Sequence, residues 1–239
     1  MKREEIERLE KISGFYEKGD VMDDLIIERE VILMKQLCKN WDNAIEIGCG
    51  NGYLTEKLYP LFKNYDVVEP SKKNIGLLNK RMGKEIPCAN VLLEDFHTDK
   101  KYDNVVFLNI IEHVEDPVQE LKNVHNLLTD DGCVYISGPN GMSLNRRAGY
   151  VMGLLKSFDT LAPKDYRFGH RRLYTVEMME EHCKQAGLEI VHMKGIYLKP
   201  LQEAKMYELG MDVVKAFYEL GEDVPQYCAQ LLVIARKAR

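Results

Sequence analysis

The chain has 239 residues, of which 45% are hydrophobic and 30% charged, as expected for a soluble globular protein with one sizeable α/β domain. Its net charge of −5 argues against a general affinity for nucleic acid or anionic membranes. The six cysteines include no C-x-x-C pair, and no apolar run reaches the ~20 residues that span a bilayer. The charged N-terminus is unlike a signal peptide. We therefore expect a cytoplasmic protein without a metal site.

The first 39 residues predict two helices, at 2–19 and 22–39. In the second helix, apolar residues recur mostly at helical spacing, and charged residues lie between them.

The most informative stretch is a glycine-rich turn between a strand and a helix. Gly48, Gly50 and Gly52 follow an apolar run at alternate positions, and helix-forming residues come next. Glycine is needed where the backbone takes positive φ or approaches a ligand closely. The helix start then offers unpaired N–H groups to a polar or anionic group.

A second apolar run ends in Glu69, 19 residues after Gly50. At the tip of a neighbouring strand, this carboxylate can accept both hydroxyls of a ribose. The glycines are spaced G-x-G-x-G, unlike the dinucleotide fingerprint G-x-G-x-x-G. A purely structural tight turn is the alternative, but the flanking strand, the following helix and Glu69 favour a nucleoside site.

From Trp41 onward, predicted strands and helices alternate. The strands are at 43–47, 65–69, 89–93, 104–109 and 132–138, and the helices at 53–62, 71–82 and 117–128. This alternation predicts a parallel sheet covered on both faces. Ligands in such sheets bind beyond the carboxyl ends of the strands, where the glycine turn, Glu69, Leu93–Asp95 and Asn109–His113 fall.

Residues 141–174 interrupt the alternation and are basic. The segment has seven Lys or Arg and two Asp, a balance of +5. This island predicts either binding of an anionic group, such as phosphate or carboxylate, or simply a solvated face. Met152–Leu155, Phe158 and Leu161 predict a short amphipathic helix in a substrate-side lid.

The C-terminal part predicts a helix at 175–186 capped by Thr175, a strand at 189–198, a helix at about 201–220 and a strand at 227–236. Tyr197 and Lys199, at the end of the sixth strand, either line the pocket or lie on the surface of an edge strand. We expect one domain, 1–239, with a helical cap.

Three stretches together resemble the class I S-adenosylmethionine-dependent methyltransferases: Glu46–Gly52, Val68–Ser71 and Asn109–Pro117. The match runs from about residue 40 to 140 and more loosely to the C-terminus. The branch resembled is that of small-molecule methyltransferases similar to ubiquinone-biosynthesis enzymes. The resemblance implies a Rossmann-like seven-stranded sheet of order 3-2-1-4-5-7-6. Its last strand is antiparallel, and helices cover both faces. It also implies that the helices of 1–39 cover the site.

The resemblance implies S-adenosyl-L-methionine as the cofactor. The glycines would approach its methionine moiety, Leu93 or Glu94 would border the adenine, and Asn109 and Ile111 would pass beneath the methionine arm. Arg29 would either reach the methionine carboxylate or pair with a neighbouring glutamate. The expected cofactor-binding residues are Arg29, Glu46, Gly48, Gly50, Asn51, Gly52, Glu69, Pro70, Leu93, Glu94, Asn109 and Ile111.

A methyl donor with its own leaving group needs alignment and exclusion of water rather than a fixed catalytic triad. His113 is predicted to face the substrate, either as a general base or as a structural residue that holds its loop. His170 is the second candidate base. The expected substrate-binding residues are Arg171, Tyr174, Tyr197 and Lys199.

We expect methyl transfer to an oxygen, in preference to a nitrogen, of a small anionic metabolite. The alternatives are an RNA methyltransferase and a non-catalytic S-adenosylmethionine-binding protein. Enzymes that methylate exocyclic base nitrogens carry Asn/Asp-Pro-Pro-aromatic where this chain has Asn109-Ile110-Ile111-Glu112. The glycine spacing also disfavours a nicotinamide oxidoreductase. The acceptor's identity and the oligomeric state stay open.

Overall fold

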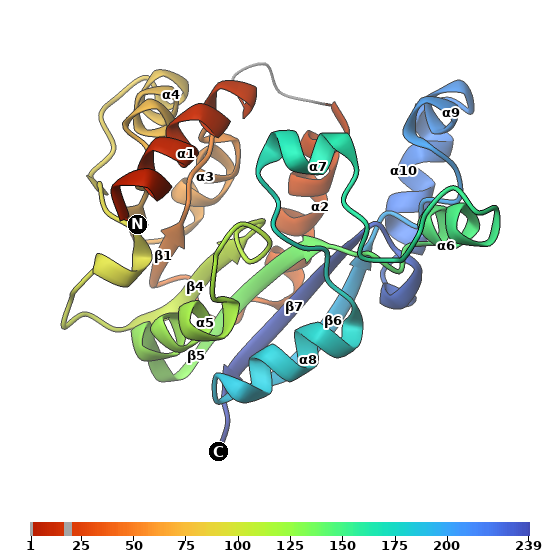
Figure 1. Cartoon of the computed structure of the whole chain (residues 1–239). Helices are drawn as coiled ribbons and strands as arrows, with labels where there is room; N and C mark the ends of the chain where they lie inside the picture. The colour runs from red at the N-terminus through yellow and green to blue at the C-terminus, as the bar shows by residue number, and fades with distance from the viewer. Residues whose placement is uncertain (1, 17–20) are drawn as a thin grey trace.

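A computed structural model describes residues 2–16 and 21–239 (Figure 1). Its centre is a seven-stranded sheet of order β3-β2-β1-β4-β5-β7-β6, which confirms the predicted fold. Neighbouring strands from β3 to β5 are parallel, and β7 is antiparallel to both β5 and β6. The strands are β1 (Asn43–Ile47), β2 (Asn64–Val68), β3 (Cys88–Ala89), β4 (Tyr102–Leu108), β5 (Leu128–Pro139), β6 (Leu188–Ile196) and β7 (Gln230–Lys237).

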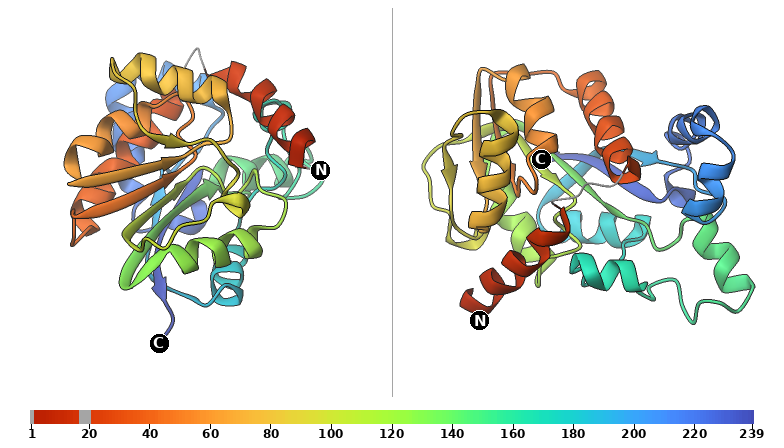
Figure 2. Two further views of the ribbon diagram at one scale, coloured as in Figure 1. Left: turned by 90° about the vertical axis from the view of Figure 1, so that its left-hand side faces the viewer. Right: turned by 90° about the horizontal axis from the view of Figure 1, so that it is seen from above.

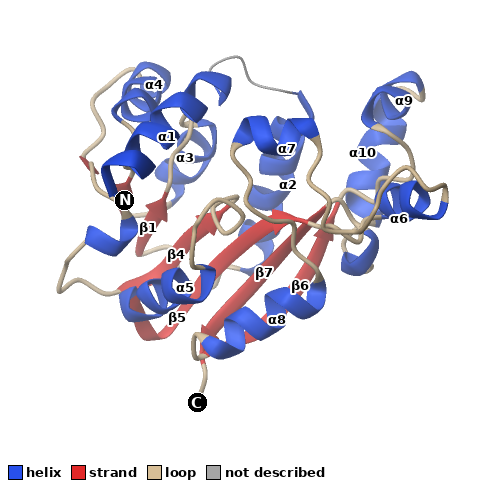
Figure 3. Ribbon diagram, in the orientation of Figure 1, coloured by secondary structure: helices blue, strands red, loops and turns tan. Residues whose placement is uncertain are grey.

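Helices cover both faces of this sheet (Figures 1 and 3). The helices of the described residues are α1 (Lys2–Tyr16), α2 (Val21–Leu37), α3 (Tyr53–Leu58), α4 (Lys72–Met82), α5 (Pro117–Leu127), α6 (Leu144–Val151), α7 (Pro163–Phe168), α8 (Val176–Gln185), α9 (Glu203–Glu208) and α10 (Met211–Leu220). Short 3₁₀ turns are η1 (Tyr59–Leu61), η2 (Leu93–Asp95) and η3 (Pro225–Tyr227).

The two larger apolar cores among the described residues follow from the alternation of side chains along each strand. In β4, Val105 and Phe107 belong to the core beneath α5 and α8. Val106 and Leu108 belong to the core beneath α2, α3 and α10. Because both faces are buried, the central strands appear in the sequence as nearly continuous apolar runs. The two perpendicular views in Figure 2 show the sheet between these helical layers.

Side-chain caps fix the start of three helices, α4, α5 and α8. Ser71 accepts a hydrogen bond from Asn74 N at the start of α4. Asp116 accepts one from Gln119 N at the start of α5. Thr175 accepts one from Met178 N, as predicted for α8. These caps begin α4 just after Glu69 and α5 just after the loop that holds His113.

Three predicted elements differ from the structure. The third strand is short, and η2 occupies residues 93–95 in place of its predicted end. The helix expected at 201–220 divides into α9 and α10, because Gly210 has a φ of 90° and breaks the regular backbone. The amphipathic helix expected within 152–161 is absent, since Gly153 takes a φ of 72° just after α6 ends.

The first predicted helix, 2–19, extends past α1 into residues that lie outside the described part of the chain. No helix among the described residues is long and apolar enough to cross a membrane.

Candidate functional site

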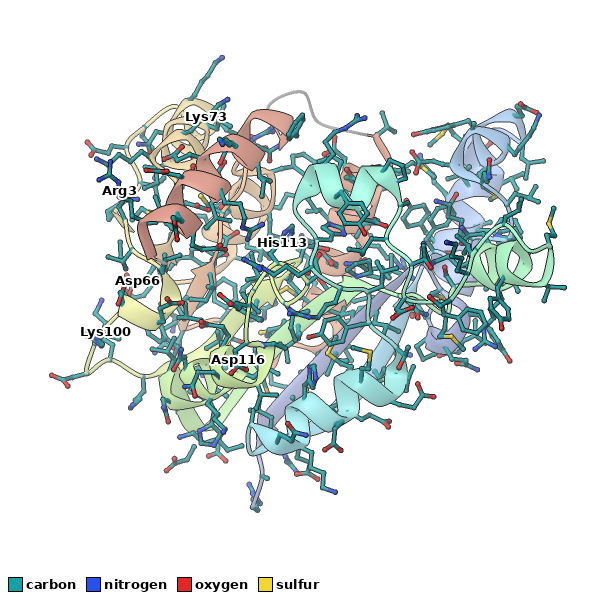
Figure 4. The ribbon with its side chains drawn as sticks, in the orientation of Figure 1. Arg3, Asp66, Lys73, Lys100, His113 and Asp116 are labelled. Carbon is teal, nitrogen blue, oxygen red and sulfur yellow. The ribbon has the colours of Figure 1, made fainter. Side chains whose placement is uncertain are left out.

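A cavity of about 1290 Å³ lies beyond the carboxyl ends of the parallel strands. Its wall comes from the glycine turn, the loop after β4, helices α1, α2 and α7, and the start of β7. In Figure 4, His113 lies near the middle of the molecule, between α1 and α7. The predicted site residues that line the cavity are Glu46, Gly48, Gly50, Asn51, Glu69, Pro70, Leu93, Glu94, Asn109, His113, His170, Arg171 and Lys199.

The glycine turn and Glu69 are in direct contact. Glu69 Oε2 accepts from Cys49 N at 3.0 Å, and Oε1 accepts from Ser71 N at 2.8 Å. Burial raises the pKa of Glu69, while these backbone hydrogen bonds act in the opposite direction. Gly50 has a φ of 51°, and a Cβ added there would meet no atom within 4 Å. The turn therefore keeps open space next to an acidic strand tip.

Five predicted site residues do not line the cavity, among them Arg29. The Arg29 guanidinium forms an ion pair with Glu222 and lies 3.9 Å from Glu219. Arg29 is therefore paired with glutamates, but with distant ones and not with the neighbouring glutamate that was expected. Its partners follow α2 by almost 200 residues in the sequence, so helical spacing could not identify them.

The other four are placed by packing. A Cβ on Gly52 would lie 2.9 Å from Leu78 Cα, so this glycine lets α3 approach α4. Ile111 and Tyr174 are fully buried in the core beneath α5 and α8. Tyr197 is also buried and stacks on Tyr218, with ring centroids 4.3 Å apart. Neither the pocket-lining nor the surface alternative holds for Tyr197.

His113 is nearly enclosed, with 12% of its side chain exposed. Its Nδ1 lies 3.3 Å from Gly169 O, and its ring centroid lies 4.9 Å from that of His170. Burial and the positive charge of His170 lower the pKa of His113 to about 3. The imidazole is therefore neutral near pH 7, and donation from Nδ1 to Gly169 O leaves the Nε2 lone pair free.

Glu112 and His170 complete a polar cluster around His113. Burial raises the pKa of Glu112 to about 7. His170 Nδ1 lies 3.5 Å from Asp165. Although burial acts to lower the pKa of His170, the Asp165 and Glu112 carboxylates raise it. Ligand atoms of Glu112, His113 and His170 all lie within 4.8 Å of one another, an arrangement that could hold a metal ion. The sequence analysis named both histidines as candidate bases but missed Glu112 and the meeting of the three side chains, because His170 comes from a distant loop.

Most arginines of the basic segment 141–174 bind backbone carbonyls. Arg146 donates to the carbonyls of Phe158 and Thr160. Arg172 donates to those of Ile111, Val114 and Glu115. Arg171 donates to His113 O and to Glu5. These guanidinium groups hold loops together, so the sequence count of positive charge overstates what this segment offers an anion.

The cavity wall near α7 and α9 carries a mixed charge cluster. Lys199 Nζ lies 3.6 Å from Glu203, and Lys164 Nζ lies 3.7 Å from Asp23 and 4.0 Å from Glu203. Burial lowers the pKa of Lys199, while Glu203 raises it. The lysines lie at the cavity as cations already paired with acids.

Helix α1 lies across the cavity and is held at two points. Glu10 accepts from Ser71 Oγ at 3.0 Å and Lys72 N at 2.7 Å, at the start of α4. Arg8 donates to Gly169 O at 3.1 Å and to His113 O at 3.2 Å. The helix therefore joins the two ends of the site, a role for Arg8 and Glu10 that no local sequence pattern indicates.

Comparison with known proteins agrees with this architecture. A family described as "Methyltransferase domain" matches residues 19–193. A ubiquinone biosynthesis O-methyltransferase from Rickettsia felis is 24% identical, over 96% of this chain and 97% of its own. One from Marinobacter nauticus is 26% identical, over 71% and 72%.

Two solved structures share the fold. A possible histamine N-methyltransferase from Thermotoga maritima has a TM-score of 0.67 and 18% identity, over 95% of this chain and 97% of its own. The N-methyltransferase NodS from Bradyrhizobium japonicum, solved with S-adenosyl-L-homocysteine, has a TM-score of 0.56 and 17% identity, over 89% and 87%.

Proposed function

The chain belongs to the family of methyltransferase domains, and from this membership we propose that it transfers a methyl group from S-adenosyl-L-methionine to an oxygen of a small molecule. One observation carries the proposal: the glycine turn, Glu69 and the His113 loop all face one cavity. The names of the relatives, which are O-methyltransferases, support oxygen as the acceptor atom.

The residues at the glycine turn fit the donor. Glu69 would accept the ribose hydroxyls, and the open side of Gly50 would let the backbone approach the methionine part. Leu93 and Glu94 would border the adenine, while Glu46, Gly48, Asn51 and Pro70 would complete this end of the wall. When bound, the donor supplies a methyl group on a sulfonium that leaves readily.

The His113 loop would hold the acceptor. The Nε2 lone pair of a neutral His113 could take the proton from an acceptor hydroxyl, with His170 as the second candidate. The low pKa of His113 makes it a weak base. The alternative role is structural: His113 would hold its loop through the contact of Nδ1 with Gly169 O. Lys199 and Arg171 would bind an anionic group of the acceptor by displacing their present acidic partners.

Two segments would close this site. Helices α1 and α2, within residues 1–39, contribute Leu9, Ile12 and Ile27 to the cavity wall, and α7 of segment 141–174 contributes Lys164. We propose that both act as covers within a single domain, 1–239, and exclude water during transfer.

The test is a methyl-transfer assay with isotopically labelled donor and three classes of acceptor: hydroxylated aromatic acids, small amines and RNA. We expect S-adenosylhomocysteine to form with a hydroxylated acceptor, and the label to appear in a methyl ether. Incorporation of the label into RNA at low salt, and its loss at high salt, would support a nucleic-acid enzyme instead. Donor binding without turnover of any acceptor would support a non-catalytic binding protein.

A further inference from the structure

A buried carboxylate lies behind the cavity wall, on α2. Glu30 is 0% exposed, and Asn109 Nδ2 lies 3.1 Å from its Oε1 and 3.2 Å from its Oε2. Asn109 has a φ of 58° at the end of β4, a conformation that asparagine adopts more readily than most residues. Its Oδ1 accepts from Gln230 Nε2. This network joins α2, β4 and β7 at one point.

The side chains that form hydrogen bonds with Glu30 are all uncharged. Among the described residues no basic side chain forms an ion pair with it, and its neighbour Arg29 turns away to Glu222. Burial raises the pKa of Glu30 to about 7, with a further rise from Glu112 on the loop after β4. Ser137 on β5, Asn109 and Gln230 oppose the rise through hydrogen bonds. An ionised carboxylate buried without a counter-charge is costly.

The position of this carboxylate relates it to the cavity. Asn109 and Gln230 both line the cavity, and each is in the Glu30 network. Glu30 is thus one side chain removed from the wall, at the tip of β4, beside the cavity in which the proposed function places the donor. A cationic ligand group at that wall would supply the positive counter-charge that Glu30 lacks within the protein.

We propose that Glu30 is a positioning residue that favours the cationic sulfonium donor over its neutral thioether product. The carboxylate acts through Asn109 and requires no direct contact with the ligand. The inference rests on donor binding in this cavity, which is part of the proposed function. Because the product lacks the positive charge, transfer of the methyl group removes the attraction and favours product release.

The number of protons released when a ligand binds tests this role, because a purely structural role of Glu30 would not change that number. Near pH 7 a fraction of Glu30 is protonated, and a bound sulfonium should lower its pKa and release a proton. S-adenosylhomocysteine, which is neutral at sulfur, should release fewer protons. Calorimetric titration of the full chain at pH 7, in two buffers with different ionisation enthalpies, measures this number for each ligand.

The matched variant is Glu30→Gln. We expect the ratio of the two dissociation constants, product over donor, to fall about tenfold, as for one unit of pKa coupling. The difference in proton release between the two ligands should become smaller, with the remainder coming from Glu46 and Glu112, whose pKa values are also raised to about 7. Glu28→Gln, on the same helix but bonded to Tyr53, should keep both properties of the wild type.

Equal proton release by the two ligands in the wild type would overturn the inference, whether or not the variant folds. An unchanged affinity ratio in a folded Glu30→Gln protein would do the same. If neither ligand bound the wild type, the donor site itself would be wrong, which is a separate failure.

Discussion

Glu69 Oε2 accepts a hydrogen bond from the backbone N–H of Cys49, with 3.0 Å between the two atoms. The contact joins the tip of β2 to the glycine turn after β1, two features 20 residues apart in the sequence. Because both border the same cavity, one ligand can meet the carboxylate and the turn at once. This is the arrangement that a nucleoside with a charged tail requires.

Replacement of Glu69 tests the donor end. Glu69→Ala should weaken the affinity for S-adenosylmethionine about 10- to 100-fold, because hydrogen bonds from the ribose hydroxyls to a carboxylate are lost. Calorimetry measures the dissociation constant. Asp66→Ala, on the same strand but bonded to Lys100 and Tyr102, is the control and should bind normally. Unchanged affinity in folded Glu69→Ala would remove this residue from the site.

Replacement of His113 separates catalysis from loop support. If it accepts the proton, His113→Ala should lower kcat about 10²- to 10⁴-fold and leave the donor affinity nearly unchanged. His192→Ala, at an exposed position on β6, should behave as the wild type. Loss of donor affinity or of thermal stability at full turnover would favour the structural role through Gly169 instead.

The basic segment should divide into structural and binding residues. Arg172 donates to three backbone carbonyls, so Arg172→Ala should lower the free energy of unfolding by about 1–3 kcal/mol. Thermal or denaturant unfolding measures the loss. A variant as stable as the wild type, but with a raised acceptor KM, would show that Arg172 binds substrate.

Lys199 should behave in the opposite way. Lys199→Met keeps most of the aliphatic stem and removes the charge that faces the cavity. We expect a KM for an anionic acceptor raised about tenfold or more, with the KM for an uncharged analogue unchanged. Equal effects on both acceptors would argue against an anion site at this wall.

Glu46 gives a test of pH-dependent stability. Burial raises its pKa from 4.5 to about 7, although Thr55 and Tyr65 donate hydrogen bonds to it. The folded state therefore holds this proton over a range where the unfolded chain has lost it. The stabilisation is complete below pH 4.5, declines as pH rises and is absent above about pH 7.

Glu46→Gln stays neutral, so its free energy of unfolding should rise relative to that of the wild type as the pH increases from 5 to 8. The gain is up to roughly 3 kcal/mol, at about 1.4 kcal/mol for each unit of pKa. Glu56→Gln, an exposed carboxylate of α3 paired with Arg81, should show no such gain. Parallel stability curves for Glu46→Gln and the wild type would contradict the prediction.

Local patterns in the sequence predicted a parallel sheet and the residues at its strand ends, whereas the strand order was implied by the resemblance to class I methyltransferases. Alternating apolar strands and amphipathic helices leave few topologies, and the glycine turn marks the first strand end. The direction of a single side chain is different. Arg29 was expected at the donor and Tyr174 at the acceptor, but in the folded protein Arg29 pairs with Glu222 and the Tyr174 hydroxyl contacts His182.

The same limit applies to charge. Seven basic residues in segment 141–174 suggested an anion site, yet the carbonyls that Arg146 and Arg172 bind carry no sequence signal. The sequence alone also does not predict the buried contact between Glu30 and Asn109, because α2 and β4 meet only in the folded protein. Residues that act through tertiary contacts need the structure.

A crystal structure with S-adenosyl-L-homocysteine tests the central claim most directly. We predict that the ribose hydroxyls contact Glu69 and that the ligand sulfur faces the Asn109–His113 loop. The direction of the missing methyl should point toward His113 and the wall with Lys199. A ligand whose ribose lies away from Glu69, or whose sulfur faces away from His113, would contradict the account.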